Sequence, residues 1–244
     1  MNPIRVGVVL AVAGALICGV APAAVAEGGS RVAEGGSRAA AGGSRLAAVK
    51  AAGAAAIAAR QAILGTDDAL AASATHLPGG VGAELQSLVE ANESGLDQLG
   101  ETINADTQVS QAIADVESIV TSYRIYTLVG PKVSLVVADD HGAAVLTEFG
   151  PLTANLQTAI TQAAAAGRDV SGAQGLLSQL QGDVAAATAI VSEAPGQVLP
   201  LTPAGYPANR STLVAAAGSL GTARADLEQA AADAQGILGD VGGP

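Results

Sequence analysis

Aromatic residues are almost missing from this chain. Its 244 residues include no tryptophan, one phenylalanine and three tyrosines. A glycoside hydrolase places two carboxylates across a substrate cleft, and few aromatic rings are present here to line one. The 22 acidic residues can pair on helix faces without any catalytic role. The composition argues against carbohydrate cleavage, and no Gly-x-Ser-x-Gly motif or phosphate-binding loop indicates another class of enzyme.

Thiol chemistry is excluded as well. The only cysteine, Cys18, lies inside an apolar N-terminal segment. Ile17 precedes it, where lipidation requires a small residue, so we expect no lipid anchor at this position. Once that segment is removed, no thiol remains to form a disulfide or a thiolate metal site.

Residues that bind metal ions are equally scarce. The chain has two histidines, and one cluster resembles a set of metal ligands: Asp139, Asp140 and His141. Successive residues of a helix point about 100° apart, so these three side chains do not converge on one ion. We therefore expect no metal, no cofactor and no catalytic residue.

Basic residues are few and scattered. The chain has 11 of them against 22 acidic residues, which gives a formal net charge of −11. Such a surface lacks the positive patch that attracts nucleic acid, so nucleic acid is excluded as a partner. The shortage of lysine and tryptophan beside apolar helix faces also weighs against binding to a lipid surface.

The features that are present begin with an export signal. Arg5 precedes the apolar run Val6–Val20, and Ala24-Val25-Ala26 fits the pattern that signal peptidase cleaves. Residues 1–26 are therefore predicted to be a signal peptide that is cleaved near Ala26. The mature protein would then be secreted or associated with the cell envelope. No second uninterrupted apolar run reaches about 18 residues, so we expect no transmembrane anchor.

A short repeat follows this signal. Three heptapeptides, each with the sequence Gly-Gly-Ser-Arg at its centre, begin at Glu27, Glu34 and Ala41. Two glycines and a serine in every seven residues oppose a stable helix. Residues 27–43 are therefore interpreted as a flexible linker, and residues 44–240 as a helical bundle domain whose first helix is capped by Ser44.

Helical periodicity dominates the domain. Alanine, the best helix former, is abundant, and we predict helices over about 45–64, 81–104, 131–166, 171–194 and 211–238, with a short one near 107–120. Gly65 is expected to break the first helix, Gly150-Pro151 to kink the fourth, and residues 195–209 to form an extended crossover. The fold class is therefore all-α, an elongated antiparallel bundle of about five to six helices.

Coiled-coil-like seams support this architecture. Leucine, valine and alanine recur every seven residues in the helix over 171–194 at Val170, Leu177, Val184 and Val191, and again at Ala173, Leu180, Ala187 and Ala194. The last helix repeats Leu213, Leu220, Leu227 and Ala234, with Ala217, Arg224, Ala231 and Leu238 expected at the second seam position. Such seams can pair within one chain or between chains, so a homo-oligomer also fits the pattern.

One segment resembles a known group of proteins. Ser118–Leu135 reads SIVTSYRIYTLVGPKVSL and is followed by Ala138-Asp139. This stretch resembles the Tyr-Arg-[Val/Ile]-Tyr … Pro-Lys-Val core of secreted, alanine-rich helical proteins of high-GC Gram-positive bacteria, which also share a Leu-Pro-Leu-Thr-Pro crossover like that at residues 199–203. The resemblance covers roughly residues 44–240. It implies export and a helical bundle, and it implies no catalytic residue because the group has no assigned chemistry.

The same segment holds the candidate binding residues. Tyr123, Arg124, Tyr126 and Lys132 are interpreted as a recognition patch, in which tyrosines stack on a flat or glycan ligand and Arg124 binds a carboxylate. The alternative is a structural plug, in which the tyrosines fill the end of the bundle and Arg124 pairs with Asp115 or Glu117.

The sequence as a whole indicates a non-enzymatic, exported helical-bundle protein of the bacterial envelope or extracellular space. Its role would be structural or an interaction with an envelope protein or a wall polymer. Two alternatives stay open. One is an amphipathic module that binds a lipid or membrane surface. The other, less favoured, is a cell-wall hydrolase with its site at residues 123–132.

Overall fold

The chain folds into helices that pack side by side along a rod. A computed structural model describes residues 38–77 and 79–242, and this part contains no strand. The all-α bundle predicted from the sequence is confirmed. The signal peptide predicted at residues 1–26 and the first part of the predicted linker lie outside the described residues.

The elements are α1 (Arg38–Ser73), α2 (Val81–Ala105), α3 (Val109–Thr121), the π-helix η1 (Ile125–Val129), α4 (Gly130–Ala165), α5 (Ser171–Val198), the short 3₁₀ helix η2 (Pro203–Gly205) and α6 (Asn209–Gly242).

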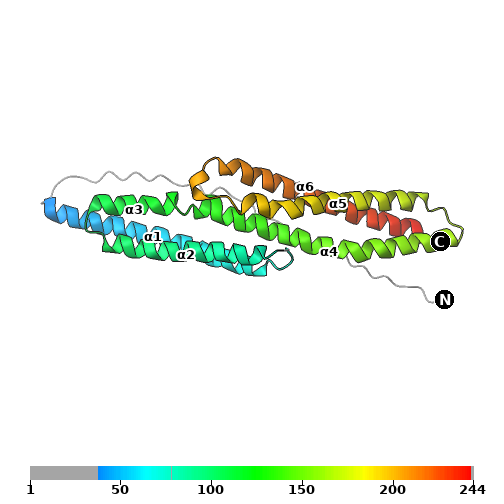
Figure 1. Ribbon diagram of the computed structural model, residues 1–244, viewed down its shortest axis with the longest axis horizontal. Coiled ribbons are helices and arrows are strands. Elements are labelled where there is room, and N and C mark those ends of the chain that lie inside the picture. Colours follow the sequence, from blue (N-terminus) through cyan, green and yellow to red (C-terminus); the bar gives the residue numbers. More distant parts are fainter. Residues whose placement is uncertain (1–37, 78, 243–244) are drawn as a thin grey trace.

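The helices form two groups that share α4. Figure 1 shows α1, α2 and α3 side by side at one end of the rod, and α5 and α6 alongside each other toward the opposite end. Helix α4 runs from the middle of the molecule to the far end, and it contacts α1 as well as α5 and α6. The π-helix η1 joins α3 to α4 and also contacts α1 and α6. The middle of the rod is therefore the place where both groups meet.

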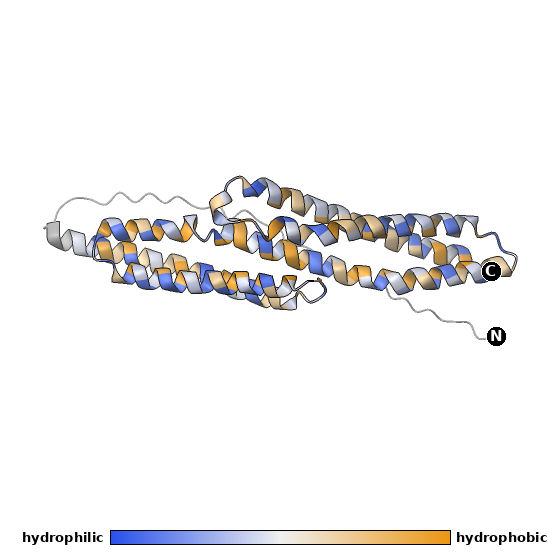
Figure 2. Cartoon of the chain, viewed as in Figure 1, coloured by the Kyte–Doolittle hydropathy of each residue, from blue (hydrophilic) through white to orange (hydrophobic). Residues whose placement is uncertain are grey.

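Each group encloses its own apolar core. Figure 2 shows hydrophobic (orange) and hydrophilic (blue) segments in alternation along the helices of both groups. The N-terminal core is built from α1, α2, α3, η1 and the first two turns of α4, and it also takes in Val198 of α5 and Leu213 of α6. The C-terminal core lies between the rest of α4, α5 and α6. On α4 the boundary between the cores falls between Val137 and Phe149. Val137 is the last buried apolar residue of α4 in the N-terminal core, and Phe149 is the first in the C-terminal core.

The predicted seams are confirmed in part. In α5 the second series is buried throughout, as are Leu177 and Val191 of the first series. In α6 the first series is correct, but the second was placed one residue too late. The buried second-seam residues are Ala216, Ala223, Ala230 and Ile237, whereas Arg224 and Leu238 are exposed. Alanine occurs at both positions of two of the four pairs, 216/217 and 230/231, and the pair 237/238 offers isoleucine or leucine, so these pairs did not distinguish the two registers. Ala231 of the predicted series is itself buried.

Several predicted helix boundaries were wrong. Gly65 does not end α1, because Leu64, Asp67 and Ala71 on either side of it are buried along one continuous face. Pro195 likewise lies inside α5, where its side chain is itself buried. Tertiary packing therefore outweighs the local helix-breaking tendency of glycine and proline at these places.

The boundary between the predicted linker and the first helix was also wrong. Helix α1 begins at Arg38, so the third heptapeptide is helical and Ser44 lies inside the helix instead of capping it. Alanines at 39–41 and 47–48 flank its two glycines and favour the helix. Helix α4 also continues through Pro151.

Helix α1 has an apolar composition. By length and composition alone, residues Gly42–Ser73 form the one stretch of the described chain that is apolar enough to cross a membrane. Alanine supplies most of this apolar character, and charged residues such as Lys50 and Arg60 interrupt it. Only a small share of the stretch is buried, so an alanine-rich face of α1 is exposed.

Candidate functional site

The three tyrosines of the chain lie around one turn of backbone, where α3 passes into η1. Tyr123 and Tyr126 belong to this turn, and Tyr206 reaches it from the connection between α5 and α6. Two arginines stack on two of these rings. We call the set Arg60, Arg124, Tyr126 and Tyr206 the arginine–tyrosine junction.

The turn itself has an unusual backbone. Arg124 has φ 46° and ψ 42°, and it is the one described residue other than glycine with a positive φ. This left-handed conformation is unfavourable for a residue with a Cβ and is found where surrounding structure holds it in place. The carbonyl of Arg124 then accepts hydrogen bonds from the amides of Thr127, Leu128 and Val129, at 3.2, 2.8 and 3.3 Å.

The core holds this backbone in place. Ile125, Leu128 and Val129 of η1 are all buried in the N-terminal core. These buried side chains leave Arg124 and Tyr126 at the periphery. π-helical turns occur frequently at functional sites, and here the turn leaves Tyr126 exposed, with Arg124 half-buried at its N-terminal end.

Arg124 stacks on Tyr206. Its guanidinium carbon lies 4.3 Å from the centre of the Tyr206 ring, within the range of a cation–π interaction. The Nε atom of Arg124 is buried and has no hydrogen-bond partner. The pairing of Arg124 with Asp115 or Glu117 that the sequence suggested does not occur, and Gln111 donates to Asp115 instead, at 3.1 Å.

Arg60 stacks on Tyr126 in the same way. Its guanidinium carbon lies 5.0 Å from the ring centre, and its Nη1 donates to the Ala56 carbonyl of its own helix at 2.8 Å. The Nε of Arg60 is buried without a partner, like that of Arg124. Tyr126 keeps 45 % of its surface exposed. The junction therefore presents both planar rings and positive charge.

Tyr123 has a different role from its neighbours. Its side chain is half-buried, and its hydroxyl donates to the Gly95 carbonyl of α2 at 2.7 Å. A Cβ added at Gly95 would lie 2.6 Å from Cε1 of the Tyr123 ring. Burial raises the pKa of the Tyr123 hydroxyl. Tyr123 therefore packs against α2, as the structural-plug alternative expected.

Lys132 does not belong to a surface patch, because only 2 % of it is exposed. Its Nζ donates to the carbonyls of Leu199 and Leu201, at 2.7 and 2.9 Å. Burial lowers the pKa of this lysine, although the Glu84 carboxylate opposes the shift. Lys132 thus ties α4 to the crossover that carries Tyr206, and it positions the junction without facing a ligand.

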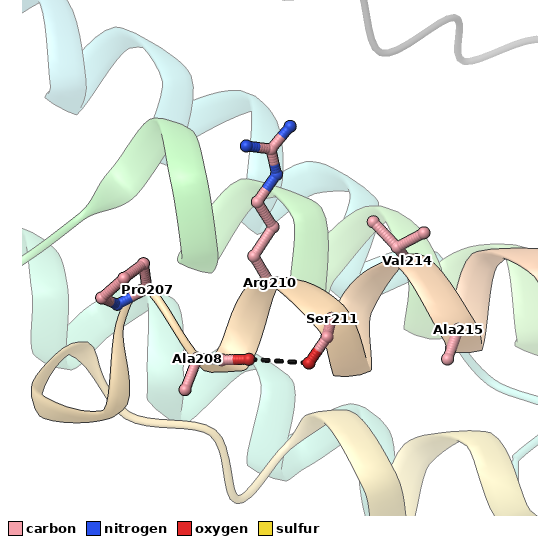
Figure 3. A pocket seen from close by; sticks show the side chains of 6 residues that line it. All are labelled: Pro207, Ala208, Arg210, Ser211, Val214 and Ala215. Carbon is pink, nitrogen blue, oxygen red and sulfur yellow. Dashed lines mark hydrogen bonds between the residues drawn. The ribbon is translucent and has the colours of Figure 1, made fainter.

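Beside Tyr206 the start of α6 forms an open depression. Figure 3 shows its lining: Pro207, Ala208, Arg210, Ser211, Val214 and Ala215. All six residues come from one short stretch of chain, so the depression runs along the helix surface and is not enclosed by other elements. Arg210 projects away from the helix (Figure 3), and Val214 is 64 % exposed.

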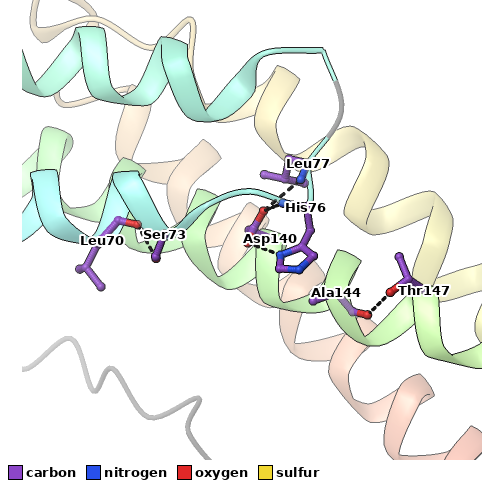
Figure 4. Close-up of polar contacts among 7 residues, drawn as sticks. All are labelled: Leu70, Ser73, His76, Leu77, Asp140, Ala144 and Thr147. Carbon is purple, nitrogen blue, oxygen red and sulfur yellow. Dashed lines mark hydrogen bonds and ion pairs between the residues drawn. The ribbon is translucent and has the colours of Figure 1, made fainter.

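A second polar cluster lies on α4 between the two cores. Asp140 is buried and accepts from the amides of His76 and Leu77, at 2.5 and 3.0 Å, while His76 Nδ1 lies 3.0 Å from Oδ2 (Figure 4). Burial alone would raise the pKa of Asp140, but these hydrogen bonds lower it. Asp140 thus holds the connection that follows α1 against α4.

Asp139, next to it, has no such partners. It is fully buried, neither carboxylate oxygen has a hydrogen-bond partner, and burial together with Asp140 raises its pKa to about 7. His141 is exposed on the next position of the helix. Within the described ranges, no group of three histidine, cysteine or acidic side chains is placed to hold a metal ion.

Comparison with known proteins does not assign this chain to a family. No protein-family model matches the chain, and neither the curated proteins nor the solved structures provide a similar protein. The function therefore has to be argued from the junction.

The chemistry available at the junction is recognition. Guanidinium groups bind carboxylates and phosphates through paired hydrogen bonds, and tyrosine rings stack on flat apolar surfaces. No nucleophile paired with a base is found among the described contacts of this site. The interactions between η1, α1 and the crossover could not be read from the sequence, because each joins residues far apart in the chain. The one local signal was the Tyr-Arg-Ile-Tyr segment itself.

Proposed function

We propose that this chain is an exported, non-enzymatic helical-bundle protein of the bacterial envelope or extracellular space, which binds a wall polymer or an envelope protein through the arginine–tyrosine junction. One observation carries this proposal: two arginines without a carboxylate partner among the described residues are stacked on tyrosines in the middle of an acidic rod. The export signal at residues 1–26 supports the location.

The surrounding structure supports a recognition role. Lys132 ties the crossover to α4, and the buried side chains of η1 hold the left-handed turn at Arg124. The junction is therefore preorganised, which reduces the entropy that ordering on binding would lose. The rod on either side of it would act as a spacer.

Two measurements test the proposal. The culture medium and the envelope fraction of the producing cells are probed for the protein, and its N-terminus is sequenced; we expect Glu27 as the first residue. The purified protein is then mixed with isolated envelopes, with the double variant Arg60→Gln/Arg124→Gln as comparison. We expect wild-type protein to sediment with the envelopes and the variant to stay in solution. Retention in the cytoplasm, or equal sedimentation of both proteins, would overturn the proposal.

A second candidate function is binding to a lipid surface. The observation in its favour is the exposed, alanine-rich face of α1. Flotation with liposomes of neutral and of anionic lipid tests it, with Ala55→Glu placing a charge on that face. Flotation that is lost in Ala55→Glu and kept in the double arginine variant would favour this candidate over the first. We expect no flotation, because α1 has no tryptophan and its single lysine, Lys50, already donates to the Asn104 carbonyl, whereas interfacial helices are anchored by several lysine and tryptophan residues.

A further inference from the structure

We infer that the arginine–tyrosine junction, extended by Arg210, binds an anionic glycan, a carbohydrate polymer that carries carboxylate or phosphate groups. This inference rests on the proposed function and adds the chemical class of the ligand. The first observation is the distribution of basic residues in an acidic chain. The chain has a net charge of −11 and 11 basic residues, yet three arginines lie on elements that meet at η1: Arg60 on α1, Arg124 before η1 and Arg210 on α6.

These elements are in contact with each other. The π-helix η1 packs against both α1 and α6. Arg60 and Tyr126 join α1 to η1, and Arg124 and Tyr206 join η1 to the segment before α6. Arg210 follows Tyr206 by one turn, and its amide donates to the Pro207 carbonyl at 3.1 Å. The three arginines therefore belong to one region of the molecule.

None of these arginines is neutralised by the protein. The ion pairs formed among the described residues are His76–Asp140 and Arg224–Glu228, and neither involves Arg60, Arg124 or Arg210. Arg60 and Arg124 each also retain a buried Nε without a hydrogen-bond partner. A buried donor without a partner is uncommon in folded proteins and calls for an explanation. A ligand that carries several anionic groups along its length supplies a separate partner for each of these guanidinium groups.

The tyrosine rings favour a sugar as the carrier of that anion. The Arg60 and Arg124 planes lie over the rings of Tyr126 and Tyr206 at 5.0 and 4.3 Å, and almost half of the Tyr126 surface remains exposed. An exposed ring packs against the apolar face of a sugar while the neighbouring guanidinium binds its acidic group. A peptide of acidic residues offers the charge without that flat face.

The shape of the region favours a polymer over a small molecule. The depression beside Tyr206 is lined by one stretch of α6 and runs along the helix, from Pro207 to Val214 (Figure 3). A small ligand is normally buried in a cavity lined by several elements. An open, extended surface instead accommodates several successive units of a polymer, and each unit contributes modestly to the binding free energy.

The test uses the intrinsic fluorescence of the protein. The chain has no tryptophan, and its three tyrosines all lie at or beside the junction, so tyrosine emission reports on this region. The purified protein is titrated with polygalacturonate, a glycan with carboxylate groups, and with phosphorylated dextran, a glycan with phosphate groups, and binding is confirmed by calorimetry. Neutral dextran, polyglutamate and phosphatidylglycerol vesicles serve as competing probes. We expect a change in emission and a salt-sensitive affinity for at least one anionic glycan, and no binding of neutral dextran.

Variants assign the binding to the junction. Arg124→Gln and Arg210→Gln are each expected to weaken binding about tenfold, as the loss of a hydrogen bond to a charged group predicts. Arg210 is exposed on the first turn of α6, so its variant keeps the fold even where Arg124→Gln does not. The control is Arg224→Gln, which removes an exposed arginine from the same helix far from the junction and is expected to leave the affinity unchanged.

Three results would overturn the inference. Polyglutamate or phosphatidylglycerol vesicles that bind as tightly as the glycans would assign the site to acidic peptide or to lipid. Equal effects of Arg210→Gln and Arg224→Gln would show that overall charge and not the junction controls binding. Binding to whole envelopes that depends on Arg124, without binding to either purified glycan, would remove the ligand class and leave the proposed function standing. Loss of envelope binding as well would remove both.

Discussion

The two halves of the rod have cores of different composition. The C-terminal half, formed by α5, α6 and the second part of α4, is sealed by repeating leucine, valine, isoleucine and alanine, with Phe149 as its aromatic residue. The N-terminal half, which includes α1, α2, α3, η1 and the start of α4, buries Asp67, Lys132, Asp139 and Asp140 beside its apolar core, whereas the described part of the C-terminal half buries one charged side chain, Asp233 of α6. The irregular backbone at Arg124 and the three tyrosines accompany this half.

This difference indicates where function resides. A repeated apolar seam stabilises a rod but leaves nothing on its surface to distinguish one turn from the next. Buried charges and a left-handed residue oppose stability, so they persist only where the surrounding structure enforces them. The N-terminal half contains four of the five buried charged residues of the described chain and the left-handed residue, next to the arginine–tyrosine junction. We therefore propose that recognition resides there and that the C-terminal half acts mainly as a spacer.

The largest expected effect concerns the two cores themselves. Leu96→Ala in the N-terminal core and Leu180→Ala in the C-terminal core each remove a fully buried side chain, and each is expected to lower the free energy of unfolding by about 3 to 5 kcal/mol. Val198 and Leu213 pack into the N-terminal core, so we expect the halves to unfold together in urea, followed by circular dichroism. Two transitions, each shifted by one substitution only, would show that the halves are independent.

The next effect concerns the buried acids of the N-terminal half. The pKa of Asp139 is raised from 3.8 to about 7 in the folded protein. Its contribution to stability is therefore fully present below about pH 4 and is lost as the pH rises through 7, which amounts to about 4 kcal/mol. Asp67, whose burial raises its pKa to about 6, acts in the same direction. Thermal unfolding is therefore expected at higher temperature at pH 5 than at pH 8.

Substitutions separate these two acids. Asp139→Asn is expected to raise the melting temperature at pH 8 and to flatten its dependence on pH between 5 and 8. Asp67→Asn should flatten the profile mainly below pH 6, since its pKa is lower. A profile of Asp139→Asn that matches wild type would show that another group controls the pH dependence.

A smaller effect is expected where α2 approaches the turn. In Gly95→Ala the new methyl group would lie within 3 Å of the Tyr123 ring and hydroxyl. The ring must move and its hydrogen bond to the Gly95 carbonyl is weakened, so we expect a loss of about 1 to 3 kcal/mol in unfolding free energy. Tyrosine emission should change in parallel. Unchanged stability and emission would mean that Tyr123 does not fix this turn.

The smallest effect is expected in the spacer and has the opposite sign. A Cβ added at Gly182 of α5 meets nothing within 4 Å. Gly182→Ala should therefore stabilise the protein by about 0.5 to 1 kcal/mol, because alanine favours the helix and restricts the unfolded chain. Urea denaturation alongside Gly95→Ala compares the two halves directly. A destabilised Gly182→Ala variant would indicate that the exposed face of α5 makes a contact, for example with a second copy of the chain.

Much of the fold could be predicted from local patterns, and much of the junction could not. The heptads of α5 are confirmed because each core residue recurs within two turns of its own helix. The second seam of α6 was misplaced because three of its four residues have an equally apolar residue at the next position, as Ala216 has Ala217 and Ile237 has Leu238. Gly65 and Pro195 were expected to end helices, and both lie inside them because buried neighbours hold the backbone helical. Tyr126 is exposed, as the recognition-patch alternative required, whereas Tyr123 packs against α2 as the structural-plug alternative required, and Lys132 of the predicted patch is buried.

Periodicity and composition by themselves determined that this chain forms long, closely packed helices, because alanine content and a seven-residue repeat act through neighbours within a turn or two. Only the tertiary structure decided what happens in the middle of the rod. There Arg124 meets Tyr206, Lys132 meets the carbonyls of Leu199 and Leu201, and Asp140 meets His76. Each of these contacts joins segments that are distant in the chain, and it forms only after the two cores bring α1, α4 and the α5–α6 crossover together.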